Sequence, residues 1–515
     1  MNHDFPKNLR LFVVFILQLP PRLVIILPFI CLLVPAGSQS QNKFEFSVNC
    51  RNAYQEIIRL RLSSGQSLID EEKRTHPDNL IPYFLENYID FFVLFFNEDP
   101  KEFAARSVHE DKRLRLMDQA SKSSPFLLFS KSMIHFQWAA IKIKFGKTWD
   151  AGWEFRRSFL QTRENQMRFP EFTPNAMLGG AMQVVAGTIP EGYQWLSNLL
   201  GMRGDILTGM RMLNQFIGMK DPLADIFKDE AIFYFLYLKF YIENKRDEVF
   251  EFLKEKNIDL VNNHLFAYLA ANLALNNQQS ARAEQIILQK NHDPAYFSTP
   301  VWDFEMGWAR LNHLEPDANR YLEKFLMEFR GKFYVKEALQ KLSWFYFLQG
   351  DIQKADSCRR LILQKGSTEA EADKQALKDA KSNHWPNQLL LKARLFNDGG
   401  YNERALQLLN GLSSSDFSSL PERLEFAYRL ARIYDDLGRH DDAIAAYLTT
   451  IKLGSGEKEY YAARAALQVG FIYEHRGDCT HANAYYQKCL DLKDHEYKNS
   501  LDQKAKAGML RCKAN

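Results

Sequence analysis

The sequence predicts an all-α protein, an α-α superhelix built from stacked helical hairpins. The 515-residue chain holds only 25 Gly and 18 Pro, less than their usual combined share of about 12%, so few turns and long helices are expected. No stretch alternates convincingly with the period of two that indicates a strand. The C-terminal half repeats one residue pattern, and such repeats stack into solenoids.

The repeated pattern is a large apolar residue, a small one, an aromatic residue, a Gly, an Ala and a second aromatic residue. Its clearest copies are Leu430, Ala431, Tyr434, Gly438, Ala443 and Tyr447, and Val469, Gly470, Tyr473, Gly477, Ala482 and Tyr486. The same frame fits Leu342, Ser343, Tyr346, Gly350 and Ala355, and also Ala393, Phe396, Gly400, Ala405 and Leu409. Small residues let two helices approach closely, and the Gly supplies the left-handed turn that ends the first helix.

This pattern resembles the tetratricopeptide repeat (TPR), a pair of antiparallel helices of about 34 residues. The resemblance implies a superhelix in which neighbouring pairs bury one another's apolar faces, and a non-catalytic role in protein binding. The turn glycines Gly400, Gly438 and Gly477 are 38 and 39 residues apart, and Gly350 precedes Gly400 by 50. That longer gap leaves room for an insertion at 365–387, which we expect to be an extended helix end or a mobile linker.

Weaker copies of the pattern occur in the N-terminal half. One copy is Trp138, Ala139, Gly146, Ala151 and Phe155, with Lys142 where the aromatic residue belongs. Another is Ala270, Ala271, Ala274, Ala283 and Ile287, with Gln278 where the turn Gly belongs. We therefore expect an atypical helical region with degenerate repeats at 39–220. A TPR-like array ending in a polar capping helix should follow at 221–515.

Glycine and proline are concentrated in residues 176–215. An apolar helix, Pro190, an aromatic helix and the turn Gly201-Met202-Arg203-Gly204-Asp205 follow one another here. This order resembles a segment of the tetratricopeptide-repeat-39 and inclusion-body-clearance family, with Met202 in place of that family's aromatic residue. The resemblance implies a non-enzymatic repeat protein.

Residues 1–38 have the layout of a secretory signal peptide. Lys7 and Arg10 precede two apolar runs, at 11–19 and 23–34, and the small residues Ala36 and Ser38 follow at the spacing of a cleavage site. If uncleaved, residues 11–34 would associate with the membrane, but Arg22 beside two prolines makes a span costly. Ile30, before Cys31, is not the small residue of a lipoprotein signal. We expect export to the periplasm or cell envelope.

Charge and cysteine content narrow the class of protein further. The chain has a formal net charge of +3, which becomes +1 once residues 1–38 are removed. This balance excludes nucleic-acid binding by bulk electrostatics. The five remaining cysteines are Cys50, Cys358, Cys479, Cys489 and Cys512. They are too few for a disulfide framework, and their odd number leaves at least one thiol unpaired.

No motif indicates catalysis, a metal or a cofactor. The glycines at 201–209 lack the order of a phosphate loop, and we expect a tight turn with Asp205 capping the next helix. His475, Cys479, His481 and Cys489 form the densest metal-like cluster, but they contain no Cys-x-x-Cys pair. The expectation is a protein that is not an enzyme and holds no metal or cofactor.

The concave face of a stacked array is lined by the first helix of each pair. Helical spacing places seven residues there in the last three repeats: Arg394, Asn397, Tyr428, Arg432, Asp435, Phe471 and Glu474. Their mixed polarity favours a protein or peptide partner over a lipid or a polyanion. The leading interpretation is an exported scaffold or adaptor of the cell envelope. The alternative is a ligand-binding component of an outer-membrane system for glycan uptake.

Overall fold

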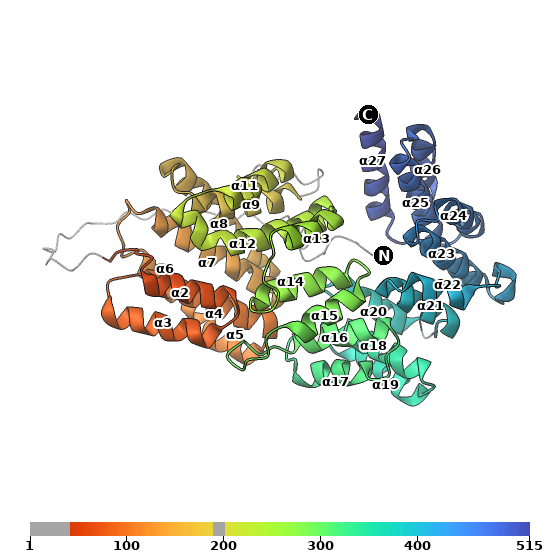
Figure 1. Ribbon diagram of the computed structural model, residues 1–515, viewed down its shortest axis with the longest axis horizontal. Coiled ribbons are helices and arrows are strands. Elements are labelled where there is room, and N and C mark those ends of the chain that lie inside the picture. The colour runs from red at the N-terminus through yellow and green to blue at the C-terminus, as the bar shows by residue number, and fades with distance from the viewer. Residues whose placement is uncertain (1–41, 189–200, 383, 515) are drawn as a thin grey trace, which may run out of the picture.

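The computed structural model describes residues 42–188, 201–382 and 384–514, and it confirms an all-α superhelix. Within these ranges the chain forms no strand, only an isolated bridge between Lys43 and Asn79. Consecutive helices pack as hairpins that stack side by side along the molecule (Figure 1). The expected signal peptide, residues 11–34 and Pro190 lie outside the described residues.

The helices of the N-terminal half are α2 (Val48–Ile58), α3 (Leu62–Thr75), α4 (Ile81–Asn97), α5 (Pro100–Arg106), α6 (Val108–Met117), α7 (Pro125–Lys144), α8 (Thr148–Arg168), α9 (Pro174–Gly187), α11 (Ile206–Gly218), α12 (Pro222–Leu238), the π-helical turn η3 (Lys239–Glu243) and α13 (Arg246–Glu255). Those that follow are α14 (His264–Leu275), α15 (Ser280–Gln289), α16 (Val301–Asn312), α17 (Ala318–Glu328), α18 (Val335–Leu348), α19 (Ile352–Gln364), α20 (Glu371–Lys381), α21 (Gln388–Gly399), α22 (Asn402–Leu409), the 3₁₀ turn η4 (Ser414–Asp416), α23 (Leu420–Asp436), α24 (His440–Gly454), α25 (Tyr461–His475), α26 (Cys479–Asp491) and α27 (Lys498–Ala514).

The glycines of the repeat pattern form left-handed turns between the two helices of a hairpin, as the pattern predicts. The turn residues Gly146, Gly350, Gly400, Gly438 and Gly477 all have φ between +71° and +85°. Each of them follows the first helix of a hairpin. Gln278, which replaces Gly in a degenerate copy, takes the same left-handed conformation with φ of +54°.

The N-terminal half closes into a ring of helices. Helix α2 packs on α4, α4 on α7, α7 on α9, α9 on α12, and α12 returns to α2. Inside the ring Glu230 of α12 accepts hydrogen bonds from the hydroxyls of Tyr54, Tyr88 and Tyr234 over 2.6, 2.8 and 2.6 Å. Because these tyrosines come from α2, α4 and α12, the cluster joins the two ends of the ring.

The predicted domain boundary at 220/221 falls between α11 and α12, which pack directly on one another. Within the second half, residues 365–387 contain a separate helix, α20, instead of the expected extended helix end or mobile linker. Helix α20 packs on α18 and α19, and Ala376 and Ala380 are buried there. The buried carboxylate of Asp373 accepts hydrogen bonds from the backbone N–H groups of Tyr334 (2.7 Å) and Glu337 (2.9 Å), so it caps α18.

The last hairpin, α25 and α26, is covered by α27 at the C-terminal end of the array. A disulfide between Cys479 and Cys512 ties the start of α26 to the end of α27. Cys50, Cys358 and Cys489 are free and buried. The disulfide occupies one of the cysteines considered as a metal ligand.

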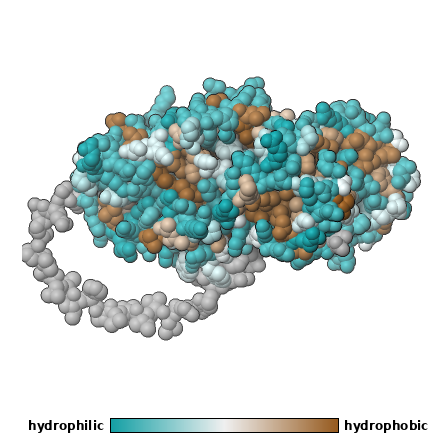
Figure 2. All heavy atoms as spheres, turned by 90° about the horizontal axis from the view of Figure 1, so that it is seen from below, coloured by the Kyte–Doolittle hydropathy of each residue, from teal (hydrophilic) through white to brown (hydrophobic). Residues whose placement is uncertain are grey.

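The face of the molecule in Figure 2 is largely hydrophilic, with separate hydrophobic patches. Large exposed apolar side chains such as Val48, Met167 and Met327 are distributed over different helices. Among the described helices, none has the length and apolar character needed to cross a membrane.

Candidate functional site: the concave cavity

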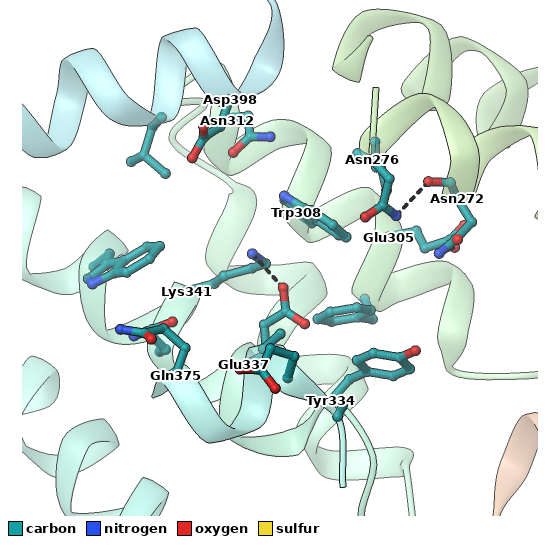
Figure 3. A pocket seen from close by; sticks show the side chains of 18 of the residues that line it. Asn272, Asn276, Glu305, Trp308, Asn312, Tyr334, Glu337, Lys341, Gln375 and Asp398 are labelled. Atoms are coloured by element: carbon teal, nitrogen blue, oxygen red, sulfur yellow. Dashed lines mark hydrogen bonds and ion pairs between the residues drawn. The ribbon is translucent and has the colours of Figure 1, made fainter. Parts of the chain in front are cut away.

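A cavity of about 260 Å³ lies on the concave side of the array, walled by α14, α16, α18, α20, α21 and α23. Figure 3 shows aromatic and charged side chains from several of these helices around an open centre. The turns explain why the walls come together. Tyr401, after α21, stacks on His313, after α16, with ring centroids 4.3 Å apart, and α21 packs on α16.

Two walls of the cavity pair a cation with an aromatic ring. Lys341 lies 4.2 Å from the ring centre of Trp308 and forms an ion pair with Glu337 over 2.9 Å. Arg394 of α21 lies 4.8 Å from the ring centre of Trp344, which belongs to α18 as Lys341 does. A cation is attracted to the negative face of an aromatic ring, so each contact stabilises both side chains. The cavity therefore presents aromatic surface and positive charge side by side.

An ion-pair network continues from Arg394 along α21 and α23. Asp398 accepts from Arg432 over 3.1 Å and lies 3.5 Å from Arg394. Burial would raise the pKa of Asp398, but the two guanidinium groups outweigh it and hold the pKa below its ordinary range. Asp398 is therefore ionised at neutral pH, and Arg394, about a quarter exposed, is its accessible cationic neighbour.

Glu305 of α16 is an isolated carboxylate at the other end of the cavity. It is only 1% exposed, and Asn272 donates from Nδ2 to its Oε1 over 3.1 Å. Tyr241 donates to Oδ1 of Asn272 over 3.0 Å, which fixes the orientation of the amide. In the part of the chain described, Oε2 of Glu305 has no hydrogen-bond partner. Burial raises the pKa of Glu305 to about 8.

The segment before α27 reaches across the mouth of the cavity to α20. Tyr497 donates a hydrogen bond from its hydroxyl to Gln375, and Lys378 forms an ion pair with Glu496. Because Tyr497 and Gln375 both line the cavity, the C-terminal end of the chain contributes to the site.

A second, apolar cavity of about 280 Å³ adjoins the first, inside the N-terminal ring. Its walls are mainly aromatic, with Phe91 and Phe95 of α4, Phe136 of α7 and Tyr237 of α12 among them. Four residues line both cavities: Tyr241, Tyr268, Asn272 and Tyr334. The polar cavity and the apolar one therefore lie side by side and share part of their walls.

The residues proposed from the sequence fall into three environments. Arg394 and Arg432 line the concave cavity. Asn397 is fully buried and donates to Asp436 over 2.7 Å. Tyr428 is 2% exposed, with the ring of Tyr461 at 4.9 Å.

The other three lie toward the C-terminal hairpins. Asp435 accepts a hydrogen bond from Tyr447 over 3.1 Å. Phe471 packs edge-on against Tyr486 with ring centroids 5.8 Å apart. Glu474 pairs with Arg511 of α27 over 2.6 Å. A partner-binding role for these residues stays a prediction.

The sequence did not identify Glu305, Trp308, Lys341 and Trp344 as site residues. They lie before the last three repeats, and only in those three did helical spacing assign residues to the concave face. A signal was available for Glu305. Its neighbours three and four residues away on a helix are all apolar: Val301, Trp302, Trp308 and Ala309. A lone acid on such a face is unusual because burial of a charge is costly.

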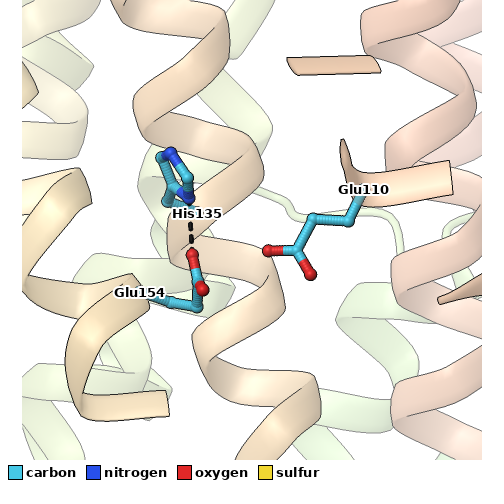
Figure 4. Close-up of side chains that lie close together, drawn as sticks. All are labelled: Glu110, His135 and Glu154. Atoms are coloured by element: carbon cyan, nitrogen blue, oxygen red, sulfur yellow. Dashed lines mark hydrogen bonds and ion pairs between the residues drawn. The ribbon is translucent and has the colours of Figure 1, made fainter. Parts of the chain in front are cut away.

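Glu110, His135 and Glu154 form a buried cluster in the N-terminal ring (Figure 4). His135 Nδ1 lies 2.5 Å from Oε2 of Glu154, and Lys142 Nζ lies 2.8 Å from Glu110 and 3.0 Å from Glu154. Burial would raise the pKa of Glu154, but His135 and Lys142 lower it. The ammonium of Lys142 contacts both carboxylates, and Arg157 lies 3.0 Å from Glu154, so two cations already pair with the two acids. These contacts account for a lysine at position 142, where the repeat pattern has an aromatic residue.

No protein-family model and no curated protein sequence matches the chain. Among solved structures, the TPR domain of P58(IPK) aligns with 13% identity over 80% of this chain and 95% of that chain, with a TM-score of 0.21. The APC/C hetero-tetramer Cut9–Hcn1 aligns with 11% identity over 88% of this chain and 95% of that chain, with a TM-score of 0.26. Scores this low carry no functional argument. The chain's own consecutive hairpins define an all-α superhelix of stacked helical repeats.

Proposed function

We propose that this protein is a non-catalytic interaction scaffold that binds a segment of a partner protein in its concave cavity. The observation that carries the proposal is the two contacts between a cation and an aromatic ring in the cavity, Lys341 with Trp308 and Arg394 with Trp344. Aromatic and arginine side chains held in fixed positions are the residues that dominate protein recognition. A helical-repeat array provides the extended concave surface on which such a segment can lie.

Charge reversal at Arg394 tests this proposal. Arg394→Glu changes an accessible cavity residue, and Arg360→Glu makes the same change at an exposed position of α19. Both variants and the parent chain are used to capture proteins from the native envelope, and captured proteins are identified by mass spectrometry. We expect a partner that is lost with Arg394→Glu and kept with Arg360→Glu. Equal capture by both variants would contradict the assignment of the cavity.

We further propose that the protein is exported and that residues 1–38 are removed. The layout of residues 1–38 supports this, and so does the Cys479–Cys512 disulfide, since disulfides persist in oxidising compartments. Counting thiols in the unfolded, unreduced protein tests both points. Cys50, Cys358 and Cys489 should react, whereas a retained signal segment would add Cys31 and a missing disulfide would add two thiols.

Glycan binding is a second candidate function. The cavity combines the flat faces of Trp308 and Trp344 with amide groups such as Asn276 and Gln375, and a sugar ring presents apolar faces and hydroxyls that suit such walls. Retention of the mature chain on immobilised glycans, abolished by Trp344→Ala, would favour this candidate over a protein partner.

A further inference from the structure

We infer that the Glu305 end of the concave cavity is a subsite for a cationic group, the guanidinium or ammonium of a basic side chain on the bound segment. This inference rests on the proposed function and specifies the chemistry of the partner. Its basis is a buried carboxylate oxygen, Oε2 of Glu305, without a hydrogen-bond partner in the part of the chain described. An unsatisfied buried polar atom costs free energy, and a ligand is one of the few explanations for keeping it.

The neighbouring charges leave Glu305 available. Lys341, the lysine among the cavity-lining residues, is paired with Glu337 over 2.9 Å. Arg432 is paired with Asp398 over 3.1 Å. Across the described residues Glu305 forms no salt bridge within 4.0 Å, and the hydrogen bond from Asn272 is neutral. Once Glu305 is ionised, a cation from outside would therefore meet a carboxylate that the protein's own cations do not compensate.

Aromatic rings line the cavity alongside Glu305. Tyr241, Tyr268, Trp308 and Tyr334 all contribute to the wall, and Figure 3 shows Trp308 and Tyr334 near Glu305. A cation is attracted to the face of an aromatic ring as well as to a carboxylate. Trp308 already makes such a contact with Lys341, so the rings of this cavity are positioned for cations.

The adjoining apolar cavity accounts for the rest of the bound group. It shares the wall residues Tyr268 and Tyr334 with the concave cavity. The alkyl stem of an arginine or lysine, or an apolar neighbour in the partner, would contact these rings while the charged head reaches Glu305. The subsite thus suits a segment in which a basic residue accompanies an apolar one.

A matched pair of small probes tests the subsite directly. n-Hexylguanidinium and n-hexylurea share their shape, but only the first is charged, and a guanidinium keeps its charge throughout the accessible pH range. Calorimetric titration of the mature chain at about pH 8.5 should give at least about tenfold tighter binding of n-hexylguanidinium, because charge-assisted hydrogen bonds are the stronger ones.

Two glutamine variants complete this experiment. Glu305→Gln should weaken n-hexylguanidinium binding at least about tenfold, whereas Glu328→Gln, on the exposed side of α17, should leave it unchanged. Equal affinity for the two probes, insensitivity to Glu305→Gln, or no saturable binding at millimolar concentration would overturn the inference. If partner capture still depends on Arg394 in that case, the proposed function stands without the cation subsite.

Discussion

Nδ2 of Asn272 donates a hydrogen bond to Oε1 of Glu305 over 3.1 Å, deep in the concave cavity. This bond joins two walls of the cavity, α14 and α16, while the other oxygen of Glu305 stays without a partner among the described residues. The relationship makes Glu305 both the most specific chemical feature of the cavity and a source of instability for the unliganded protein.

The raised pKa of Glu305 should make stability fall as pH rises. The folded protein keeps the proton up to about pH 8, whereas the unfolded chain loses it near the ordinary value of 4.5. Between these values the folded state binds more protons, so the free energy of unfolding decreases with rising pH and levels off above the folded pKa.

Urea unfolding of the parent and of Glu305→Gln at about pH 5 and about pH 8.5 measures this effect. Each unit of pKa shift corresponds to about 1.4 kcal/mol, so the parent should lose at least about 2 kcal/mol more than the variant over this interval. Identical pH dependence of the two proteins would show that Glu305 ionises normally in the fold.

Lys142→Met should strongly destabilise the N-terminal ring. The substitution keeps the apolar stem but leaves the buried carboxylates of Glu110 and Glu154 without their shared ammonium. Breaking a buried pair by removing one partner costs about 3 kcal/mol or more. Chemical denaturation measures the change, with Lys452→Met at an exposed position as the control, for which we expect less than about 0.5 kcal/mol. A small effect at Lys142 would mean that the cluster is solvated.

Tyr54→Phe should loosen the closure of the ring. It removes one of the hydroxyls that donate to Glu230 and leaves the edge-to-face contact with the ring of Tyr88 intact. A hydrogen bond to a charged or buried acceptor contributes about 1–3 kcal/mol. Hydrogen exchange should therefore become faster in α2 and α12, with α25 unchanged. Equal exchange in all three helices would contradict a closing role for the cluster.

Gly470→Val should destabilise the last hairpin more than Gly438→Ala. A Cβ at Gly470 would lie 2.4 Å from Cε1 of Tyr486, whereas one at Gly438 meets no atom within 4 Å. Overpacking costs about 1–3 kcal/mol, and a left-handed non-glycine residue costs about 1–2 kcal/mol. Because valine adds two further methyl groups at the crowded site, its effect on thermal unfolding should be the larger. The reverse order would refute the close helix approach.

The fold was largely predictable from the sequence because a few residue types fix the hairpins. Gly438 and Gly477 take the left-handed conformation in their turns, and Ala431 and Ala482 are fully buried, as the repeat pattern predicted. Helix α20 was not predicted because its sequence is mostly polar. Its alanines Ala376 and Ala380 form a buried face only when the helix packs on α18.

The candidate site was predictable only in part. Arg394 and Arg432 reach the cavity, but helical spacing alone could not foresee the packing of α21 on α16 or the cover that α27 places over Glu474. Glu305 lies in a part of the chain where the repeat pattern is weak, so the pattern could not show which residues face the groove. Lys142 gave a usable signal, since a charged residue at an aromatic position indicates a buried partner.

Site-specific photo-crosslinking tests most directly whether the concave cavity binds the partner. A photoreactive phenylalanine is placed at Gln375, which is half-buried and lines the cavity, or at Met327, which is 65% exposed on the outer helix α17. Irradiation of cells that produce these variants should yield a crosslinked partner from Gln375 and none from Met327. Crosslinking from Met327 alone would place the partner on the outer surface and contradict the account.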